Sequence, residues 1–300
     1  MSKIYIVLER LFYAMENKRS NIELHVHPFL DNYDMVDITR AMGMTNINIL
    51  ALLALNDSIY PKVADEVRKH YPSARKNGCG IKLPTGKCIL NAREYSTREN
   101  FHILTIGYSF DSANHKTEIR KIIDNGLENK ALVILDHPLV DNGETRTAGH
   151  ISEEMTYDLE RLCKEYSGQI ALEWNAYCKP WIRKGLQIGM NLTGHNVNYH
   201  DVNKEMEELH EKLKKEDYNL PIIADTDVHA RDTKHLLAMG TSRIIMPVEG
   251  ESAEEIVASM KKNIFNGNYE NVKEYVDSLH ILGAFCFPIL FPNHFEKPRG

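Results

Sequence analysis

The chain has 300 residues, 43% of them apolar and 26% charged, which is the composition of an ordinary globular protein with a large core. Its formal net charge of −6 at pH 7 argues against a scaffold that holds nucleic acid by bulk electrostatics, while a local basic groove stays open. No low-complexity linker or composition break interrupts it, so we expect one domain over residues 1–300.

Strand-like and helix-like segments alternate along the chain. A helix is expected at about 3–18, ahead of the first strand, and a Gly- and Lys-rich hairpin or loop at 76–87. Strands are predicted at 21–26, 46–55, 88–92, 101–107, 131–136, 169–174, 220–226 and 242–247. Amphipathic helices are predicted at 59–71, 115–125, 151–166, 202–216 and 252–265. This alternation predicts an α/β fold with a parallel sheet, which seven or eight strands would close into a barrel.

The cysteines and the two chain ends bear on location. The five cysteines (Cys79, Cys88, Cys163, Cys178 and Cys286) form no CxxC spacing, and the apolar run at 4–8 is too short for a signal peptide. We therefore expect reduced thiols in a cytoplasmic protein. An apolar tail at about 281–292 is too short to span a bilayer and contains two prolines. We expect it to pack on the body or at a subunit contact, not in a membrane; the sequence makes no prediction of oligomeric state.

Two pairs of polar residues with the same spacing follow short apolar runs. His25 and His27 follow the first predicted strand, and Asp227 and His229 follow the run at 220–224. In a strand, side chains i and i+2 point the same way, so each pair can direct two ligands to one point. Imidazole and carboxylate are ligands of zinc, manganese and iron. Because parallel strands of a barrel end on the same face, we expect the two pairs to meet there.

Other candidate ligands lie near strand ends. Glu94, His137 and Glu173 each follow or end an apolar run, whereas His102 opens one. For Glu173 we expect hydrogen bonds that support a ligand rather than direct ligation. For His102 a buried neutral histidine is the competing interpretation. A cluster of this size is typical of a two-metal site with a bridging carboxylate.

The ordered set of motifs resembles the polymerase and histidinol phosphatase (PHP) superfamily. The matching stretches are 23–27 (ELHVH), 90–108 around Glu94 and His102, 133–139, 171–176 (ALEWNA) and 223–229 (IADTDVH), with Gly240 following. The resemblance implies a distorted (β/α)7 TIM-like barrel with the metal site at the C-terminal ends of the strands, and hydrolysis of phosphate esters. It also implies metal ligation by His25, His27, Glu94, His102, His137, Asp227 and His229, with Glu94 as the bridge.

Two departures from the family pattern affect the number of ions. The second motif of the family ends in T-D-H, whereas Leu55-Asn56-Asp57 stands at the equivalent place here. The aspartate that follows the HxH motif does not align cleanly either, since Asp31 lies four residues beyond it and Asp34 seven. We therefore expect two divalent ions (Zn, Mn or Fe), with a third doubtful.

A phosphate ester needs cationic contacts besides the metals. Arg146, in the predicted loop after His137, is the first candidate because a guanidinium can bind phosphate through two donors. The further candidates are Lys179, Arg183 and Arg231. Three more histidines in predicted loops, His150, His195 and His200, are expected at the surface.

The predicted function is a metal-dependent phosphoesterase of phosphatase or nuclease type. Its partner would be a small phosphorylated substrate, and a nucleic-acid end stays open. Two alternatives remain: a PHP-like regulatory or structural module with impaired catalysis, and an amidohydrolase-like enzyme acting on C–N or C–O bonds.

Overall fold

The computed structural model describes residues 19–27, 34–53, 65, 68–73, 75–77, 79–108, 116–140, 150–192, 194, 198–229 and 232–283. The elements in chain order are β1 (Arg19–Val26), α2 (Met35–Met44), β2 (Ile49–Leu53), β3 (Arg75–Asn77), β4 (Gly80–Lys82), β5 (Cys88–Ser96), β6 (His102–Ile106), α4 (Ile119–Glu128), β7 (Leu132–Asp136), α5 (Glu153–Glu165), β8 (Ile170–Asn175), α6 (Pro180–Leu192), α7 (Val202–Lys215), β9 (Ile222–Asp225), η2 (His235–Ala238), β10 (Arg243–Pro247), α8 (Ala253–Phe265), β11 (Glu270–Val272) and α9 (Ser278–Ile281). None of the described helices is long and apolar enough to cross a bilayer.

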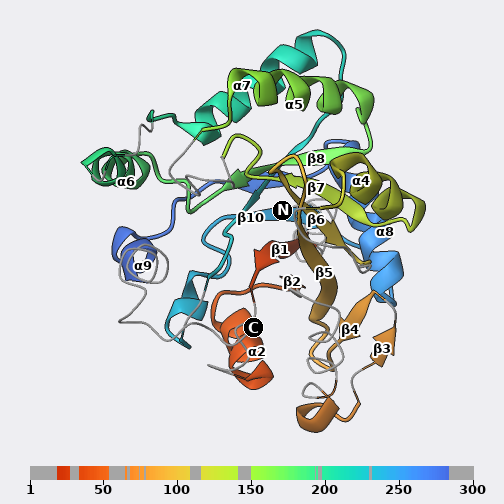
Figure 1. Ribbon diagram of the computed structural model, residues 1–300. Coiled ribbons are helices and arrows are strands. Elements are labelled where there is room, and N and C mark those ends of the chain that lie inside the picture. The colour runs from red at the N-terminus through yellow and green to blue at the C-terminus, as the bar shows by residue number, and fades with distance from the viewer. Residues whose placement is uncertain are drawn as a thin grey trace, which may run out of the picture.

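One sheet of eleven strands organises the molecule (Figure 1). Its main path runs β11-β10-β1-β2-β5-β6-β7-β8-β9, and β3 and β4 form a hairpin attached to β5. The path nearly closes on itself beyond the ends of β1 and β9. There the N–H of His27 donates to the carbonyl oxygen of Val228 at 3.0 Å, and the N–H of Val228 donates to that of His25 at 2.8 Å. The predicted distorted TIM-like barrel is confirmed.

The sheet is mixed, whereas the sequence pattern predicted a parallel one. β1, β2 and β5 pair in parallel, as do β7, β8 and β9, but β6 is antiparallel to both of its neighbours and β10 is antiparallel to β1. The reversal at β6 follows from its short connection to β5, residues 97–101, because parallel strands need a long crossover. The N–H of Thr97 closes this turn on the carbonyl oxygen of Phe101 at 2.9 Å, with Asn100 at φ +64°.

The reversed strand has a consequence for the site. β1, β2, β5, β7, β8 and β9 all run in one direction, so their C-terminal ends share one end of the barrel. Because β6 runs the other way, its first residue, His102, reaches that same end. His102 pairs in register with Ser96 on one side and with Asp136 on the other. His102, the first residue of β6, therefore lies at the same height in the barrel as the last residues of β5 and β7.

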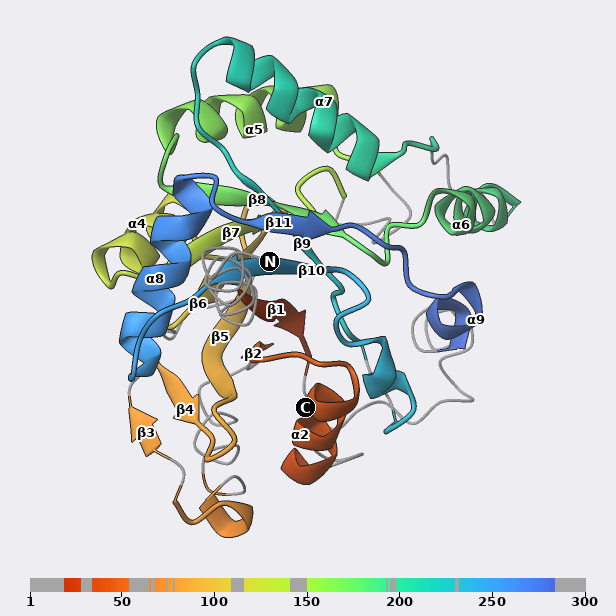
Figure 2. The same cartoon turned by 180° about the vertical axis from the view of Figure 1, so that it is seen from behind.

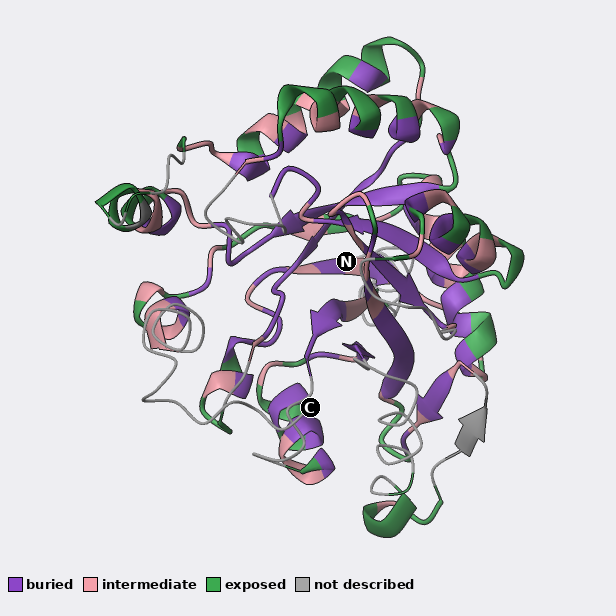
Figure 3. Cartoon of the chain, viewed as in Figure 1, coloured by how far each residue is buried: buried purple, intermediate pink, exposed green. Residues whose placement is uncertain are grey.

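Buried strands and one-sided helices account for the core. Every residue of β2, β7 and β8 is buried, as expected for strands covered on both faces. Figure 3 shows the strands buried and the outer faces of α5 and α7 exposed. α5 begins at its N-cap Ser152, whose side chain accepts the N–H of Met155, and it buries Leu159 and Leu162. α5 and α7 lie side by side next to β8 (Figures 1 and 2). α4 packs into the same apolar cluster as these two helices, whereas α8 packs into another.

All of the predicted strands are present, as are the helices predicted at 115–125, 151–166, 202–216 and 252–265 and the hairpin at 76–87. The expected helix at 3–18 lies outside the described residues. The expected helix at 59–71 lies largely outside them, although residues 65 and 68–70 are helical. Of the apolar tail, only 281–283 is described; Ile281 is buried and ends α9. α2, α6 and β11 were not predicted.

Candidate metal centre

Histidines and carboxylates from five strands converge where the parallel strands end. β1 brings His25 and His27, β5 brings Glu94, β6 brings His102, β7 brings His137, and the segment after β9 brings Asp227 and His229. The structure therefore places all seven ligands expected from the sequence in one region. Among the described residues, ligand atoms lie within 4.8 Å of one another in four overlapping groups: His25, His27 and Glu94; His27, Asp227 and His229; Glu94, His102, Asp136 and His137; and His25, Asp136 and Glu173.

Asp227 and the two N-terminal histidines form one half of the cluster. Oδ1 of Asp227 lies 3.1 Å from Nε2 of His25, 3.4 Å from Nε2 of His27 and 3.1 Å from Nδ1 of His229. The rings of His27 and His229 are 4.3 Å apart between centroids. Both elements of the predicted pairing, HxH and DxH, thus face one point, because the segment after β9 lies against the end of β1.

Glu94 joins that half to a second one. Its Oε2 lies 3.4 Å from Nε2 of His27, and its Oε1 contacts Nδ1 of His102. On the far side, Oδ2 of Asp136 lies 3.3 Å from Nε2 of His137 and 3.7 Å from Nδ1 of His102. The two oxygens of Glu94 therefore face two different groups of ligands. His102 thus lies in contact with Glu94 and near Asp136, and its role as a ligand stays a prediction.

Glu173 supports the cluster from β8. Its Oε1 lies 2.6 Å from Nδ1 of His25, and its Oε2 accepts the backbone N–H of His137 at 2.8 Å. Asn175 donates from Nδ2 to Oε2 of Glu173 at 3.0 Å and to Oδ2 of Asp227 at 2.9 Å. These contacts match the supporting role expected for Glu173.

Asp136 and Asp225 are members of the region that sequence reasoning missed. Both are fully buried, and neither oxygen of either side chain has a hydrogen-bond partner among the described residues. Each is the last residue of an apolar strand, Asp136 directly before His137 and Asp225 two residues before Asp227. An aspartate that closes a wholly buried strand next to a candidate ligand was the signal available in the sequence.

The pKa values show how strongly these groups interact. Burial and the neighbouring Glu173 raise the pKa of both Asp136 and Asp225 well above its ordinary value. Although burial opposes it, the Asp227 and Glu173 carboxylates raise the pKa of His25 to about 10. Burial and His102 lower the pKa of His137 to about 4. Groups of like charge packed at these distances need counter-charges, because uncompensated buried carboxylates are costly.

Two of the candidate ligands have strained backbones. His137 has φ +26° and Asp227 has φ +58°, in a region that residues other than glycine rarely adopt. Such conformations cost roughly 1–3 kcal/mol and are found mainly at functional sites. Gly240, at φ +77°, lies behind the cluster and donates its N–H to buried Glu23 at 3.0 Å.

The donor set fits divalent cations. Imidazole and carboxylate groups suit zinc, manganese and iron, and the orphaned oxygens of Asp136 and Asp225 are the kind that an ion would satisfy. No thiolate is in the four groups. The coarser prediction, that this region can bind divalent metal, is supported; the number and identity of the ions are not fixed by it.

Of the four candidates for phosphate binding, the structure describes two. Arg146 and Arg231 lie outside the described residues, as do Asp31, Asp57 and His195. Lys179 donates to the carbonyl oxygen of Val276 at 3.3 Å, and Arg183 is only 4% exposed. His150 and His200, expected at the surface, are partly buried beside Glu205, with 14% and 35% of their side chains exposed. The helices that follow them, α5 and α7, pack side by side and bring the two histidines together across 50 residues of sequence.

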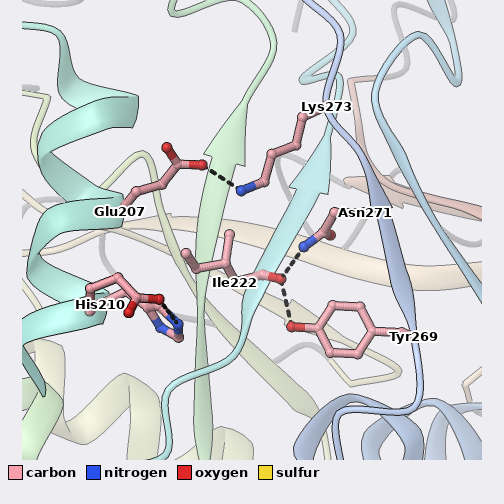
Figure 4. Close-up of a pocket in the computed structure, with 7 residues that line it drawn as sticks. Glu207, His210, Ile222, Tyr269, Asn271 and Lys273 are labelled. Atoms are coloured by element: carbon pink, nitrogen blue, oxygen red, sulfur yellow. Dashed lines mark hydrogen bonds and ion pairs between the residues drawn. The ribbon is translucent and has the colours of Figure 1, made fainter. Parts of the chain in front are cut away.

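A pocket lies apart from this region, between α7, the start of β9 and β11 (Figure 4). Its polar side chains are already engaged. Tyr269 and Asn271 both donate to the carbonyl oxygen of Ile222, at 2.8 and 2.9 Å, and Lys273 pairs with Glu207. Polar groups satisfied by one another leave little to hold a ligand, so we assign the pocket no role.

Comparisons with known proteins support the fold. No protein-family model and no curated protein matches the sequence. The fold is similar to that of PsfC from Pseudomonas syringae, with a TM-score of 0.54 at 10% identity over 91% of this chain and 99% of that one. Endonuclease Q from Pyrococcus furiosus is similar at a TM-score of 0.49 and 13% identity, over 84% of this chain and 57% of that one. A two-domain protein from Bacteroides vulgatus, described as containing a predicted PHP-like metal-dependent phosphoesterase, is similar at a TM-score of 0.48 and 10% identity, over 85% and 65%. This chain spans less than two thirds of the length of the last two.

Proposed function

We propose that the chain is a metal-dependent phosphoesterase that hydrolyses phosphomonoester or nucleotide-type substrates, the activity implied by its resemblance to the PHP superfamily. The observation that carries the proposal is the convergence of five histidines with Glu94, Asp136 and Asp227 at one end of the barrel. Asp136 and Asp225 are buried carboxyl groups without hydrogen-bond donors among the described residues, and divalent cations would offset the charge of such a cluster.

We propose two divalent ions. His25, His27, Asp227 and His229 would hold one, His102, Asp136 and His137 the other, and Glu94 would belong to both because its oxygens face both groups. Ions bound here would supply Lewis acidity, which activates water near neutral pH and neutralises charge on phosphoryl oxygens. A third ion is not proposed, because Asn56 and Asp57 replace the Asp-His of the second motif.

The residues of the chain have separate tasks in this proposal. Glu173 fixes His25, since Nδ1 of that ring points to the carboxylate and Nε2 is left for the ion. Asn175 orients Asp227 by donating to its Oδ2, so that Oδ1 faces the histidines. Holding these side chains in place before substrate arrives lowers the reorganisation needed during reaction. Arg146, from the segment after β7, is proposed to bind the phosphoryl oxygens that the ions leave free.

Substrate class and location complete the proposal. A small phosphorylated metabolite or a nucleic-acid end would be the partner, and the chain would form one domain with its centre in the barrel. The four described cysteines are free thiols, which supports a reducing compartment such as the cytoplasm.

The test is a panel of phosphate esters assayed with the purified protein. We expect hydrolysis of p-nitrophenyl phosphate or a nucleotide that is lost on chelation and restored by zinc or manganese. A protein that carries the metals but cleaves none of the monoesters, diesters and oligonucleotides would contradict the proposal and favour a non-catalytic PHP-like module. Metal-dependent hydrolysis of amides but not phosphate esters would favour the amidohydrolase-like alternative.

A further inference from the structure

A further group of side chains that could hold a metal ion lies at the N-terminal ends of α5 and α7. His150, His200 and Glu205 each offer a ligand atom, and these atoms lie within 4.8 Å of one another. Oε2 of Glu205 lies 2.9 Å from Nε2 of His150, and Oε1 lies 2.8 Å from Nδ1 of His200. The two rings stack, with centroids 3.9 Å apart and planes inclined by 24°. None of the three belongs to the groups that contain His25, Glu94 or Asp227.

The tautomer of His150 directs a lone pair at the carboxylate. Its Nδ1 lies 2.7 Å from the carbonyl oxygen of Ile151, which can only accept, so Nδ1 carries the hydrogen. Nε2 of the neutral ring is then an acceptor, it is buried, and no hydrogen-bond donor among the described residues reaches it.

This arrangement is unfavourable without a cation and favourable with one. In the neutral ring, Nε2 of His150 and Oε2 of Glu205 are two acceptors 2.9 Å apart, and a cation bound by both would satisfy both. Ligand atoms around a tetrahedral zinc ion stand roughly 3.3 Å apart. These atoms would therefore need to move only slightly farther apart to admit an ion. A zinc-binding histidine usually binds the ion through one ring nitrogen and donates a hydrogen bond from the other, often to a backbone carbonyl.

We propose that His150, His200 and Glu205 bind a zinc ion, separate from the phosphoesterase centre, that connects the N-terminal ends of α5 and α7. With three protein ligands the ion keeps one position for water. Imidazole and carboxylate donors, with no thiolate, also admit manganese, but two imidazoles in a small ligand set favour zinc. The charge of Glu205 and the acidic first turn of α5, Glu153 and Glu154, offset the positive ends of the two helices.

The ion would complete a series of links between two parallel helices. His150 lies two residues before Ser152, the N-cap of α5, and His200 lies one residue before Asp201, the N-cap of α7. Farther along, Lys212 pairs with Glu160 at 2.6 Å and Lys164 with Glu216 at 2.8 Å. These ion pairs join the middle and C-terminal parts of the two helices, which lie side by side (Figure 1). The proposed zinc site would join their N-terminal ends.

The start of α7 also leads to the centre in the barrel. Asn203 donates from Nδ2 to the carbonyl oxygen of Asn175 at 2.8 Å, and its Oδ1 accepts the Asn175 N–H at 3.2 Å. Asn175 in turn donates to Asp227. An ion on Glu205, two residues after Asn203, therefore holds the segment that positions Asn175.

The test is the zinc content of the full chain and two variants, Glu205→Gln and His200→Ala. Each protein is stripped with chelator, incubated with excess zinc, dialysed and measured by inductively coupled plasma mass spectrometry. We expect each variant to bind one equivalent less than the parent. Glu208→Gln, an exposed change one turn along the same helix, should bind as much as the parent. Cobalt added to stripped protein should give a visible absorption contribution that Glu205→Gln lacks.

Equal zinc in the parent and in either folded variant would overturn the proposal, as would a parent chain that binds no zinc. Because the variants remove different ligands, one folded variant is enough, and circular dichroism identifies it. The difference of one equivalent is measured whether or not the chain hydrolyses any ester. It should persist when Asp227→Asn is added to both proteins, so failure here and failure of the phosphoesterase proposal are distinguishable.

Discussion

Glu173 and His25 form a buried pair in which Oε1 of the carboxylate lies 2.6 Å from Nδ1 of the ring. The pair joins β8 to β1 across the barrel, and the other oxygen of Glu173 accepts the N–H of His137, whose φ is +26°. One carboxylate thus fixes the tautomer of one candidate ligand and the backbone of another. Glu173 therefore supports the proposed metal centre without being one of its proposed ligands.

Glu173→Gln should weaken metal binding while leaving the fold intact. The glutamine amide keeps the shape of the carboxylate and can still accept the N–H of His137 through its oxygen. It then presents an uncharged NH2 group to His25 in place of a negatively charged oxygen. Loss of such a supporting group typically costs about 10- to 100-fold in metal affinity. Competition with a chromophoric chelator measures this, with Glu153→Gln, a change in the first turn of α5, as the matched control. Unchanged affinity in Glu173→Gln would show that His25 does not need this partner.

Asp227→Asn and Glu94→Gln should each abolish hydrolysis, with a fall of several orders of magnitude, because each removes a charged oxygen that faces more than one histidine. Asparagine tolerates the φ of +58° at position 227, so the backbone there is preserved. Turnover of the best substrate in the panel is the measurement, and circular dichroism verifies folding. Variants that retain near-parent rates would place the activity in a contaminant or at another site.

Arg146→Ala should lower kcat/KM without removing metal. Loss of a charged, two-donor contact to phosphate costs about 1.5–3 kcal/mol, or roughly ten- to a hundred-fold in kcat/KM. Arg146→Lys should recover only part of this loss, since an ammonium cannot bind two oxygens in the same way. If neither variant changes kcat/KM, the phosphate contact lies elsewhere, with Arg183 and Arg231 as the next candidates.

Gly240→Ala should destabilise the fold more than Gly86→Ala. Both glycines have a positive φ, +77° and +83°, so each alanine is strained by about 1 kcal/mol. A Cβ at Gly240 would also lie 2.6 Å from Cδ1 of Ile47, whereas a Cβ at Gly86 meets nothing within 4 Å. We expect Gly240→Ala to cost about 1–3 kcal/mol more, measured by urea unfolding. Equal effects would mean that Ile47 repacks without cost.

The sequence predicted the site where local pattern and barrel geometry agree. HxH and DxH each place two ligands two residues apart at the end of a strand, and barrel closure brings His25 and Asp227 together. His102 was harder, because its place depends on the reversal of β6, which the short 97–101 connection causes. His102 was predicted as a ligand from the resemblance to the PHP superfamily, and the predicted strand directions alone did not indicate it.

Other features depended on contacts between distant segments. Asp136 looks like the last residue of a core strand, and only its neighbours Glu173 and His137 show that its oxygens face the cluster. His150 and His200 lie outside the helices, as predicted, but their proximity arises from the packing of α5 beside α7 and has no local signal in the sequence. α2 was missed although Asp34 and Asp37 form a capping box, a local signal that was present in the sequence.

The metal content of the Glu205→Gln variant tests the central claim most directly, because in that background the second zinc site is removed. We predict two equivalents of zinc or manganese, falling when Glu94→Ala is added, since Glu94 faces both groups of ligands. Less than half an equivalent in Glu205→Gln, with no recovery after zinc or manganese is supplied, would contradict a dinuclear centre in the barrel.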